Sequence, residues 1–235
     1  MNNKTYLNPR SIAAAVLLCA PSLTAQHLEA GAVGQNQNDA LVWANADELA
    51  ASSGFVQPLT LATTGRYAGF YNGNITLVAM SSTESGGPAP GSFIQAEIVS
   101  VAGPSGAFFG FWESLDLGGG TAPTFNIATG SEGLSLRYAL SDANAGAGLP
   151  GQDPAGHLHG RRFTATELGT YTVGFRAVDT SVNGAGGGSI HTPSDIVFIN
   201  FQAVPEPSVL ALVGGGLAGL GFLRRPRHGQ SQRRM

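Results

Sequence analysis

The strongest constraint on this fold is a set of short apolar segments with a two-residue period, separated by stretches rich in glycine, proline, serine and asparagine. In the segment 169–179, GTYTVGFRAVD, the side chains of Tyr171, Val173 and Phe175 share one face of an extended strand. Between the two ends of the chain no segment keeps a helical period, apart from one turn that we expect within 45–52. This pattern is typical of half-buried strands, so it predicts an all-β protein.

Strand signals recur along the chain, and each is bounded by turn residues. The segments that carry them are 40–45, 74–80, 92–102, 107–114, 134–140, 169–179 and 194–203. The last of these is apolar on both faces, which predicts a central position in a sheet. Because no helices alternate with the strands, parallel βαβ units are not indicated, and we expect an antiparallel β-sandwich of immunoglobulin-like build over residues 26–203.

The first 25 residues follow the order of a secretory signal peptide. Lys4 and Arg10 precede an apolar run, and small residues stand before Gln26, so we expect a signal helix at 1–25 that is removed on export. Cys19 is the only cysteine of the chain and lies within this segment. The exported part therefore has no thiol, and a metal site there must use imidazole and oxygen ligands.

The C-terminal segment 204–235 combines three features in a fixed order. They are the tripeptide Pro205, Glu206 and Pro207, an apolar stretch at 208–223, and a basic cluster that includes Arg224 and Arg225. As a helix, 208–223 measures about 24 Å, somewhat less than the ~30 Å hydrocarbon core of a bilayer. The basic end favours the cytoplasmic side. We therefore expect a transmembrane anchor helix at 208–223 that is recognised and cut. The alternative is an ordinary tail anchor that stays in the membrane.

This order resembles the PEP-CTERM sorting signal of biofilm-forming Gram-negative bacteria. The resemblance implies processing by an exosortase-type enzyme, which would be the first partner of the chain. It also implies a transient anchor in the inner membrane, followed by display at the cell surface or in the extracellular matrix.

Without its two ends the chain is strongly acidic. Between residues 26 and 207 there are five arginines and no lysine against 15 acidic side chains, which gives a net charge of −10. Such a charge repels nucleic acid and concentrates cations. Nucleic acid is therefore excluded as a partner.

Two histidines stand one residue apart in a chain that contains few titratable groups. On an extended segment, the side chains of His157 and His159 point to the same side at a spacing of about 6.6 Å. Zn²⁺ commonly takes four ligands, so the pair would need partners, and His191 and His27 are available. The alternative is that one imidazole bonds the backbone and the other is exposed.

The surroundings of these histidines are similar to known bacterial surface domains. The stretch that begins GHLHGRRF and continues to GTYTVGF resembles the His-x-His and Gly-x-Tyr-x-Val motifs of surface-anchored domains, and QHLEAGAVG resembles their opening. Together with the C-terminal signal, these stretches resemble a group of PEP-CTERM proteins repressed by the zinc uptake regulator. The resemblance implies zinc handling, with the four histidines as ligands. Arg161 and Arg162 depart from the pattern, because the wider group often has an aromatic residue there. We expect a solvated strand edge at these two arginines, and the alternative is that they hold an acidic polymer or an anion.

The leading hypothesis from the sequence is a non-enzymatic, surface-displayed protein that captures or stores Zn²⁺ when zinc is scarce. The first alternative is a structural or adhesive matrix protein without a metal, with extracellular polysaccharide as a possible partner. The second is a metal-assisted hydrolase with Glu113 or Asp153 as its base. No nucleophile elbow or His-Glu-x-x-His motif supports an enzyme, and we expect Trp112 in the core with Glu113 exposed beside it.

Overall fold

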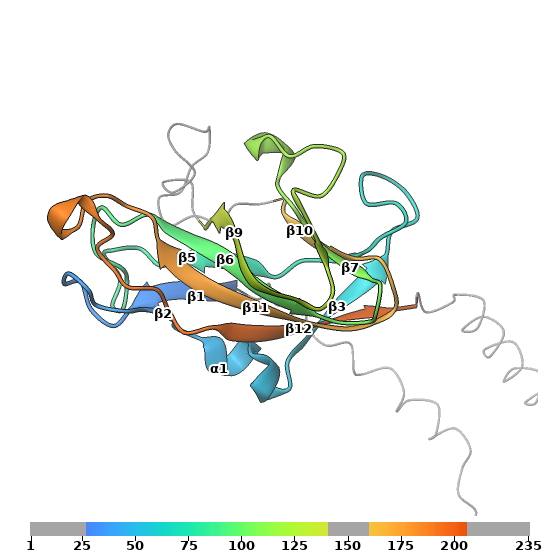
Figure 1. The fold of residues 1–235 in the computed structure, drawn as a ribbon, viewed down its shortest axis with the longest axis horizontal. Helices are drawn as coiled ribbons and strands as arrows, with labels where there is room; N and C mark the ends of the chain where they lie inside the picture. The colour runs from blue at the N-terminus through green and yellow to red at the C-terminus, as the bar shows by residue number, and fades with distance from the viewer. Residues whose placement is uncertain (1–26, 141–159, 206–235) are drawn as a thin grey trace, which may run out of the picture.

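Nearly all the regular structure in this computed structural model, which describes residues 27–140 and 160–205, is β-strand (Figure 1). The strands are β1 (His27–Ala32), β2 (Leu41–Trp43), β3 (Val56–Leu61), β4 (Tyr71–Gly73), β5 (Thr76–Ala79), β6 (Ile94–Ala102), β7 (Phe108–Trp112), β8 (Phe125–Ala128), β9 (Ser131–Ala139), β10 (Arg162–Ala165), β11 (Gly169–Asp179) and β12 (Val197–Val204). The helical elements in these ranges are the single turn α1 (Ala46–Leu49) and the 3₁₀ turns η2 (Ala51–Ser53), η3 (Leu115–Leu117) and η4 (Ala185–Gly187).

Nine strands form one sheet in the order β8-β7-β10-β4-β3-β12-β11-β6-β9. Its two edge strands, β8 and β9, are consecutive in the sequence and lie close together, so the sheet is curled into a nearly closed barrel. β12 lies between β3 and β11, which confirms the central position that its apolar sequence predicted. The pairing of β12 with β3 is parallel, whereas its pairing with β11 is antiparallel.

The remaining three strands form a small second sheet in the order β2-β1-β5. β1 pairs antiparallel with β2 and parallel with β5. A single parallel bridge between Ala40 and Thr192 links the start of β2 to the segment before β12. The small sheet is thus tied to the barrel through the same segment that carries His191.

One apolar core joins the two sheets. Tyr171, Val173 and Phe175 have no exposed surface, which confirms the alternation that the sequence of β11 predicted. Phe163 on β10 lies in the middle of an aromatic cluster, with its ring 5.2 Å from that of Phe201 and 5.7 Å from that of Phe109. These rings come from strands far apart in the sequence, so the core forms only when the sheet curls.

The all-β prediction is confirmed, and so is the helical turn within 45–52, which forms α1. The immunoglobulin-like sandwich is not found, because one curled sheet carries nine of the described strands and two of the strand pairs are parallel. The parallel partners β3 and β12 are separated by most of the chain, so no local sequence pattern predicts that they pair. The predicted helices at 1–25 and 208–223 lie outside the described residues.

Three charged side chains form a row across the outer face of β11, β6 and β9. The register places Arg176 opposite Glu97, and Glu97 opposite Arg137. The Glu97 carboxylate is fully buried and accepts hydrogen bonds from Arg137 Nε and from Arg176 Nε, both at 2.8 Å. Burial raises the pKa of Glu97, but the hydrogen bonds and charges of the two arginines outweigh it, so the pKa lies below its ordinary value.

A second carboxylate organises the segment after β11. Asp179 accepts four backbone N–H bonds, from Phe93 and Ser181 at 2.9 Å, from Ile190 at 2.8 Å and from His191 at 3.1 Å. Burial raises the pKa of Asp179, but the hydrogen bonds from these backbone groups outweigh it and hold the pKa below its ordinary value. The deprotonated carboxylate therefore fixes the return of the chain toward β12.

We expect the free energy of unfolding to fall as the pH drops below about 4. A carboxyl whose pKa is lower in the folded than in the unfolded state stabilises the fold above its unfolded pKa of about 4, and this stabilisation is lost as the pH falls through the folded pKa. Urea unfolding at pH 7, 4 and 3 measures the effect. Asp179→Asn should reduce the pH dependence, and a free energy of unfolding that is constant from pH 5 to pH 3 would contradict the assignment.

Candidate functional site

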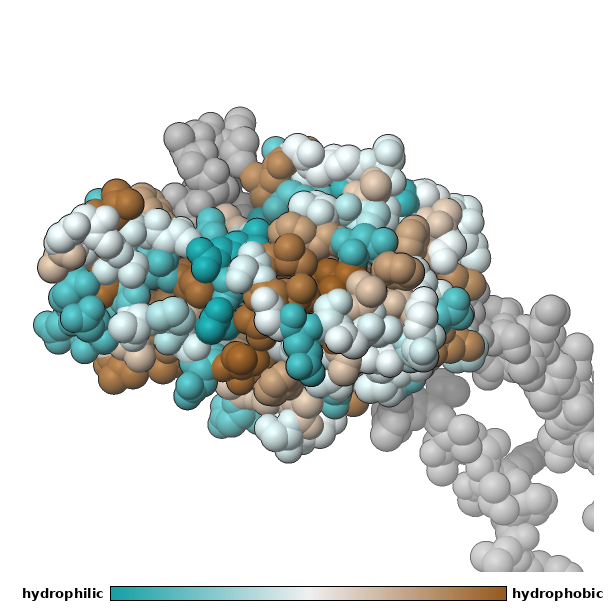
Figure 2. Space-filling model, in the orientation of Figure 1, coloured by the Kyte–Doolittle hydropathy of each residue, from teal (hydrophilic) through white to brown (hydrophobic). Residues whose placement is uncertain are grey.

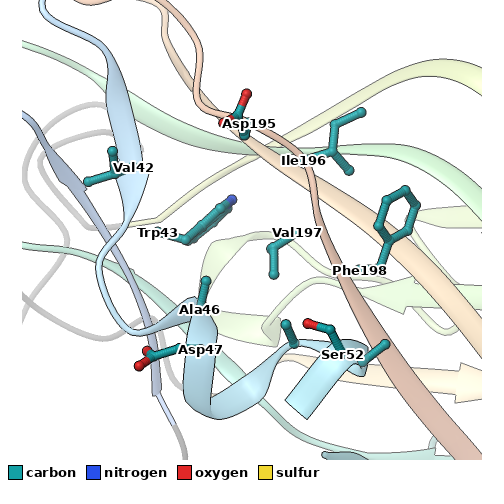
Figure 3. Close-up of a pocket in the computed structure, with 11 residues that line it drawn as sticks. Val42, Trp43, Ala46, Asp47, Ser52, Asp195, Ile196, Val197 and Phe198 are labelled. Atoms are coloured by element: carbon teal, nitrogen blue, oxygen red, sulfur yellow. The ribbon is translucent and has the colours of Figure 1, made fainter. Parts of the chain in front are cut away.

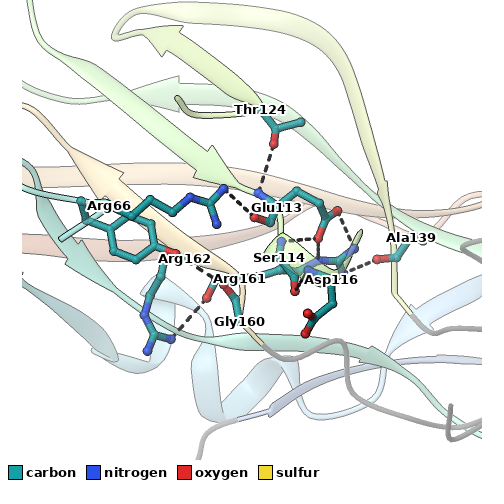
Figure 4. Close-up of polar contacts among 10 residues, drawn as sticks. Arg66, Glu113, Ser114, Asp116, Thr124, Ala139, Gly160, Arg161 and Arg162 are labelled. Carbon is teal, nitrogen blue, oxygen red and sulfur yellow. Dashed lines mark hydrogen bonds and ion pairs between the residues drawn. The ribbon is translucent and has the colours of Figure 1, made fainter. Parts of the chain in front are cut away.

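A group of connected polar side chains lies where β7 ends beside the start of β10 (Figure 4). Arg161 and Glu113 form a two-pronged ion pair, with Arg161 Nε 2.6 Å from Glu113 Oε1 and Arg161 Nη2 2.8 Å from Glu113 Oε2. The two side chains are only 8% and 16% exposed. In this setting a paired guanidinium and carboxylate are held in one geometry, because an unpaired charge would cost several kcal/mol.

The remaining faces of the Arg161 guanidinium are also occupied. Its Nη1 donates to the carbonyl oxygen of Ala139 at the end of β9. Its Cζ lies 5.3 Å from the ring centre of Tyr138 and 5.7 Å from that of Phe111, within the range of a cation–π contact. Burial raises the pKa of Tyr138, so its hydroxyl keeps its proton.

A second arginine covers the same corner from the segment between β3 and β4. Arg66 Nη2 donates to the backbone oxygen of Glu113 at 2.9 Å, and its Cζ lies 5.1 Å from the ring of Trp112. The Trp112 indole is buried and donates to Thr164 Oγ1 at 2.9 Å. A Cβ at Gly110 would come within 2.4 Å of that hydroxyl, so glycine is required there.

The predicted solvated edge at Arg161 and Arg162 is half wrong. Arg161 is buried and paired, because Glu113 and the rings of β7 and β9 surround it. Arg162 is partly exposed, and its guanidinium donates to the backbone oxygen of Arg161. The prediction that Trp112 belongs to the core is confirmed, whereas Glu113 is largely covered rather than exposed.

The Arg161–Glu113 pair has a structural role in this geometry. The space beside Arg161 and Tyr138 measures only about 10 Å³, too little for a substrate. Through Ala139 and its own backbone, Arg161 ties the end of β9 to the start of β10. It therefore fixes the two points between which the segment 141–159 runs.

His191, one of the four predicted zinc ligands, is buried with both ring nitrogens bonded to the backbone. Its Nε2 accepts from the N–H of Ala89 at 2.8 Å, and its Nδ1 lies 3.0 Å from the carbonyl oxygen of Asp39, to which it donates. The ring thus holds one proton and joins two segments around the small sheet. A metal could bind it only if one of these bonds broke.

The structure places His27 and His191 at opposite ends of β1. His27 begins the strand, whereas Asp39, which bonds His191, lies just beyond Ala32 at the other end, where Ala32 pairs with Leu41. The five residue steps of β1 span roughly 16 Å. The fold therefore does not bring His27 and His191 to one tetrahedral ion.

His157 and His159 lie outside the described residues, as does Asp153. Within 27–140 and 160–205, no group of three or more histidine, cysteine or acidic side chains is arranged to hold a metal ion. Zinc binding by the pair His157 and His159 stays a prediction of the sequence. No sequence pattern predicted the Arg161–Glu113 ion pair, because the two residues are 48 positions apart in the chain.

We expect Arg161→Gln to destabilise the fold strongly. The change leaves the covered Glu113 carboxylate without its partner, a loss of about 3–5 kcal/mol for a buried pair. Urea unfolding of the purified chain measures the difference in the free energy of unfolding. Arg162→Gln is the matched control and should change it by less than about 0.5 kcal/mol. Equal effects of the two substitutions would show that the pair adds no specific stability.

Comparison with known proteins identifies one feature of this chain. Residues 203–225 match the PEP-CTERM protein-sorting motif, which contains Pro205, Glu206, Pro207, Arg224 and Arg225. No curated protein and no solved structure matches the chain. In the described residues no helix is long and apolar enough to cross a membrane, and the segment 208–223 lies outside them. The motif marks the chain as an exported, surface-directed protein that an exosortase recognises and sorts.

Proposed function

We propose that the chain is a non-enzymatic structural or adhesive module, displayed at the cell surface or in the extracellular matrix after an exosortase removes its C-terminal anchor. The observation that carries this proposal is the position of the sorting motif. It begins at residue 203, whereas β12 ends at Val204. The central strand of the barrel therefore leads into the sorting signal without a linker, and a cut between Pro207 and the apolar segment 208–223 would release a folded body.

The state of the charged side chains supports a structural rather than a catalytic role. Glu113, one of the two bases considered for a hydrolase, is only 16% exposed, and both its carboxylate oxygens are bonded to Arg161. Glu97 is likewise paired with arginines on both sides. These ion pairs connect neighbouring strands and so stabilise the barrel.

We expect replacement of Arg224 and Arg225 by glutamine to block processing. The basic cluster closes the motif and favours the cytoplasmic side of the membrane, so its loss should leave the chain mainly as a larger, membrane-bound precursor. Immunoblots of membrane and extracellular fractions, in cells that contain an exosortase, measure the ratio of the two forms. Lysine at both positions is the control and should preserve processing. Normal release of the glutamine variant would contradict the proposal.

Zinc capture is the second candidate function, favoured by the spacing of His157 and His159. Since His191 is engaged by the backbone and His27 is remote from it, the candidate now depends on the pair and on ligands from its own segment. Such a site would have oxygen ligands beside two imidazoles.

Calorimetric titration of the purified, chelator-treated chain with Zn²⁺ tests this candidate. If the pair binds zinc, replacement of His157 and His159 by alanine should abolish the heat, whereas His228→Ala, a histidine outside the predicted set, should leave it unchanged. Equal heats from the two variants, or no heat from the unchanged protein, would reject zinc capture and leave the metal-free module.

A further inference from the structure

Two neighbouring hollows lie on the outer surface around the start of β12 and share Ile196 and Phe198. The first, of about 560 Å³, is lined by β2, α1, η2 and the segment that leads into β12 (Figure 3). The second, of about 410 Å³, is lined by β6, β9 and β11. Figure 2 shows apolar side chains gathered in the middle of this face of the molecule. We call the two hollows together the β12 groove.

Two aromatic side chains of the β12 groove offer a ligand different contacts: Phe198 offers an exposed ring, and Trp43 offers a buried N–H donor. The Phe198 ring is 45% exposed although it lies on the central strand, so it forms an open apolar ridge between the hollows. Trp43 lines the first hollow and is 92% buried, and its Nε1–H has no hydrogen-bond partner among the described residues. Figure 3 shows the nitrogen-bearing edge of this indole turned toward the space between Asp195 and Val197. A buried donor without an acceptor is costly, and a ligand oxygen that reached it would remove that cost.

The charges around the groove are negative. Asp47 and Asp195 line the first hollow, in which no described cationic side chain takes part, and Glu132 lines the second. Arg176 is the cation of the second hollow, and its guanidinium is already bonded to Glu97. With the net charge of −10 on the exported part, the groove favours a cationic ligand and disfavours an anionic one.

We propose that the β12 groove binds a linear polymer of amine-bearing sugars. A sugar ring offers an apolar face that stacks on Phe198, and its hydroxyl oxygens are acceptors for the indole N–H of Trp43. Its ammonium groups pair with the carboxylates of Asp47 and Asp195. Two hollows with a shared ridge suit at least two consecutive units of one chain. A basic peptide supplies the charge but lacks the flat, hydroxyl-bearing ring.

This inference names a partner for the proposed surface module, and it rests on that function for its biological setting. The two can fail separately. Binding is measured on purified protein and does not depend on sorting, whereas processing of the Arg224 and Arg225 variants does not depend on the groove.

The test is calorimetric titration of the purified full chain with a β-1,4-linked glucosamine hexamer at pH 6, where the amines are charged. Phe198→Ala should weaken binding about tenfold through the lost stacking contact. Asp195→Asn should weaken it about threefold at low salt and have less effect at high salt. Both residues are exposed, so these variants should fold. The controls are Phe108→Ala, an exposed aromatic on β7 outside the groove, and Asp116→Asn; neither should change the affinity.

Several results would overturn the proposal. No binding of the hexamer, or equal affinity of the unchanged protein and Phe198→Ala, would show that the groove does not hold it. Equal affinity for the fully N-acetylated hexamer would show that the amines are not recognised. Equal affinity for a lysine hexapeptide would show a general attraction for cations rather than recognition of a sugar.

Discussion

The fold depends on one packing arrangement, the aromatic cluster around Phe163 inside the curled sheet. Phe109, Phe201 and Phe175 reach this ring from β7, β12 and β11, with centroid distances of 5.2 to 5.8 Å. A flat sheet of nine strands would leave these rings apart, so their burial and the curl of the sheet require each other. Aromatic rings of this size contribute several kcal/mol each to a core, which makes the cluster the main reason for the barrel-like shape.

Charged side chains stabilise the rims and the outer face of this barrel. Arg161 with Glu113 joins three strand ends at one rim, and Glu97 between two arginines joins three neighbouring strands on the outside. Asp179 performs a similar task through backbone N–H groups alone. These interactions use most of the arginines of the exported part, so the acidic excess of the chain is left on the surface.

That surplus of negative charge gives the outside of the protein its chemical character. Around β12 it coincides with exposed apolar side chains and with an indole donor that has no hydrogen-bond partner in the described part of the chain. This combination of features suits the binding of a ligand. It lies at β12, the strand that leads directly into the sorting signal. The start of the sorting signal and the proposed binding groove therefore share one element of the fold, β12.

How much could be predicted from the sequence depended on whether a feature is local. The two-residue period of Tyr171, Val173 and Phe175 and the turn at α1 depend on neighbours in the chain, so both were predicted correctly. The partners of β3 and β12, or of Arg161 and Glu113, are brought together only by the curl of the sheet, and the sequence carries no trace of either pairing. His191 illustrates the same limit, because a histidine beside a glycine-rich loop is equally suited to bind a metal or to hold two backbone segments.

The sequence by itself determined the all-β class, the acidic charge and the export and sorting of the protein. Composition and a linear sorting motif do not depend on the folded structure. Only the tertiary structure decided the parallel strand pairs, the engagement of His191 and Arg161, and the groove at β12. The physical reason is that each of these depends on contacts between residues distant in the chain, whose geometry is set by the closed packing of the core.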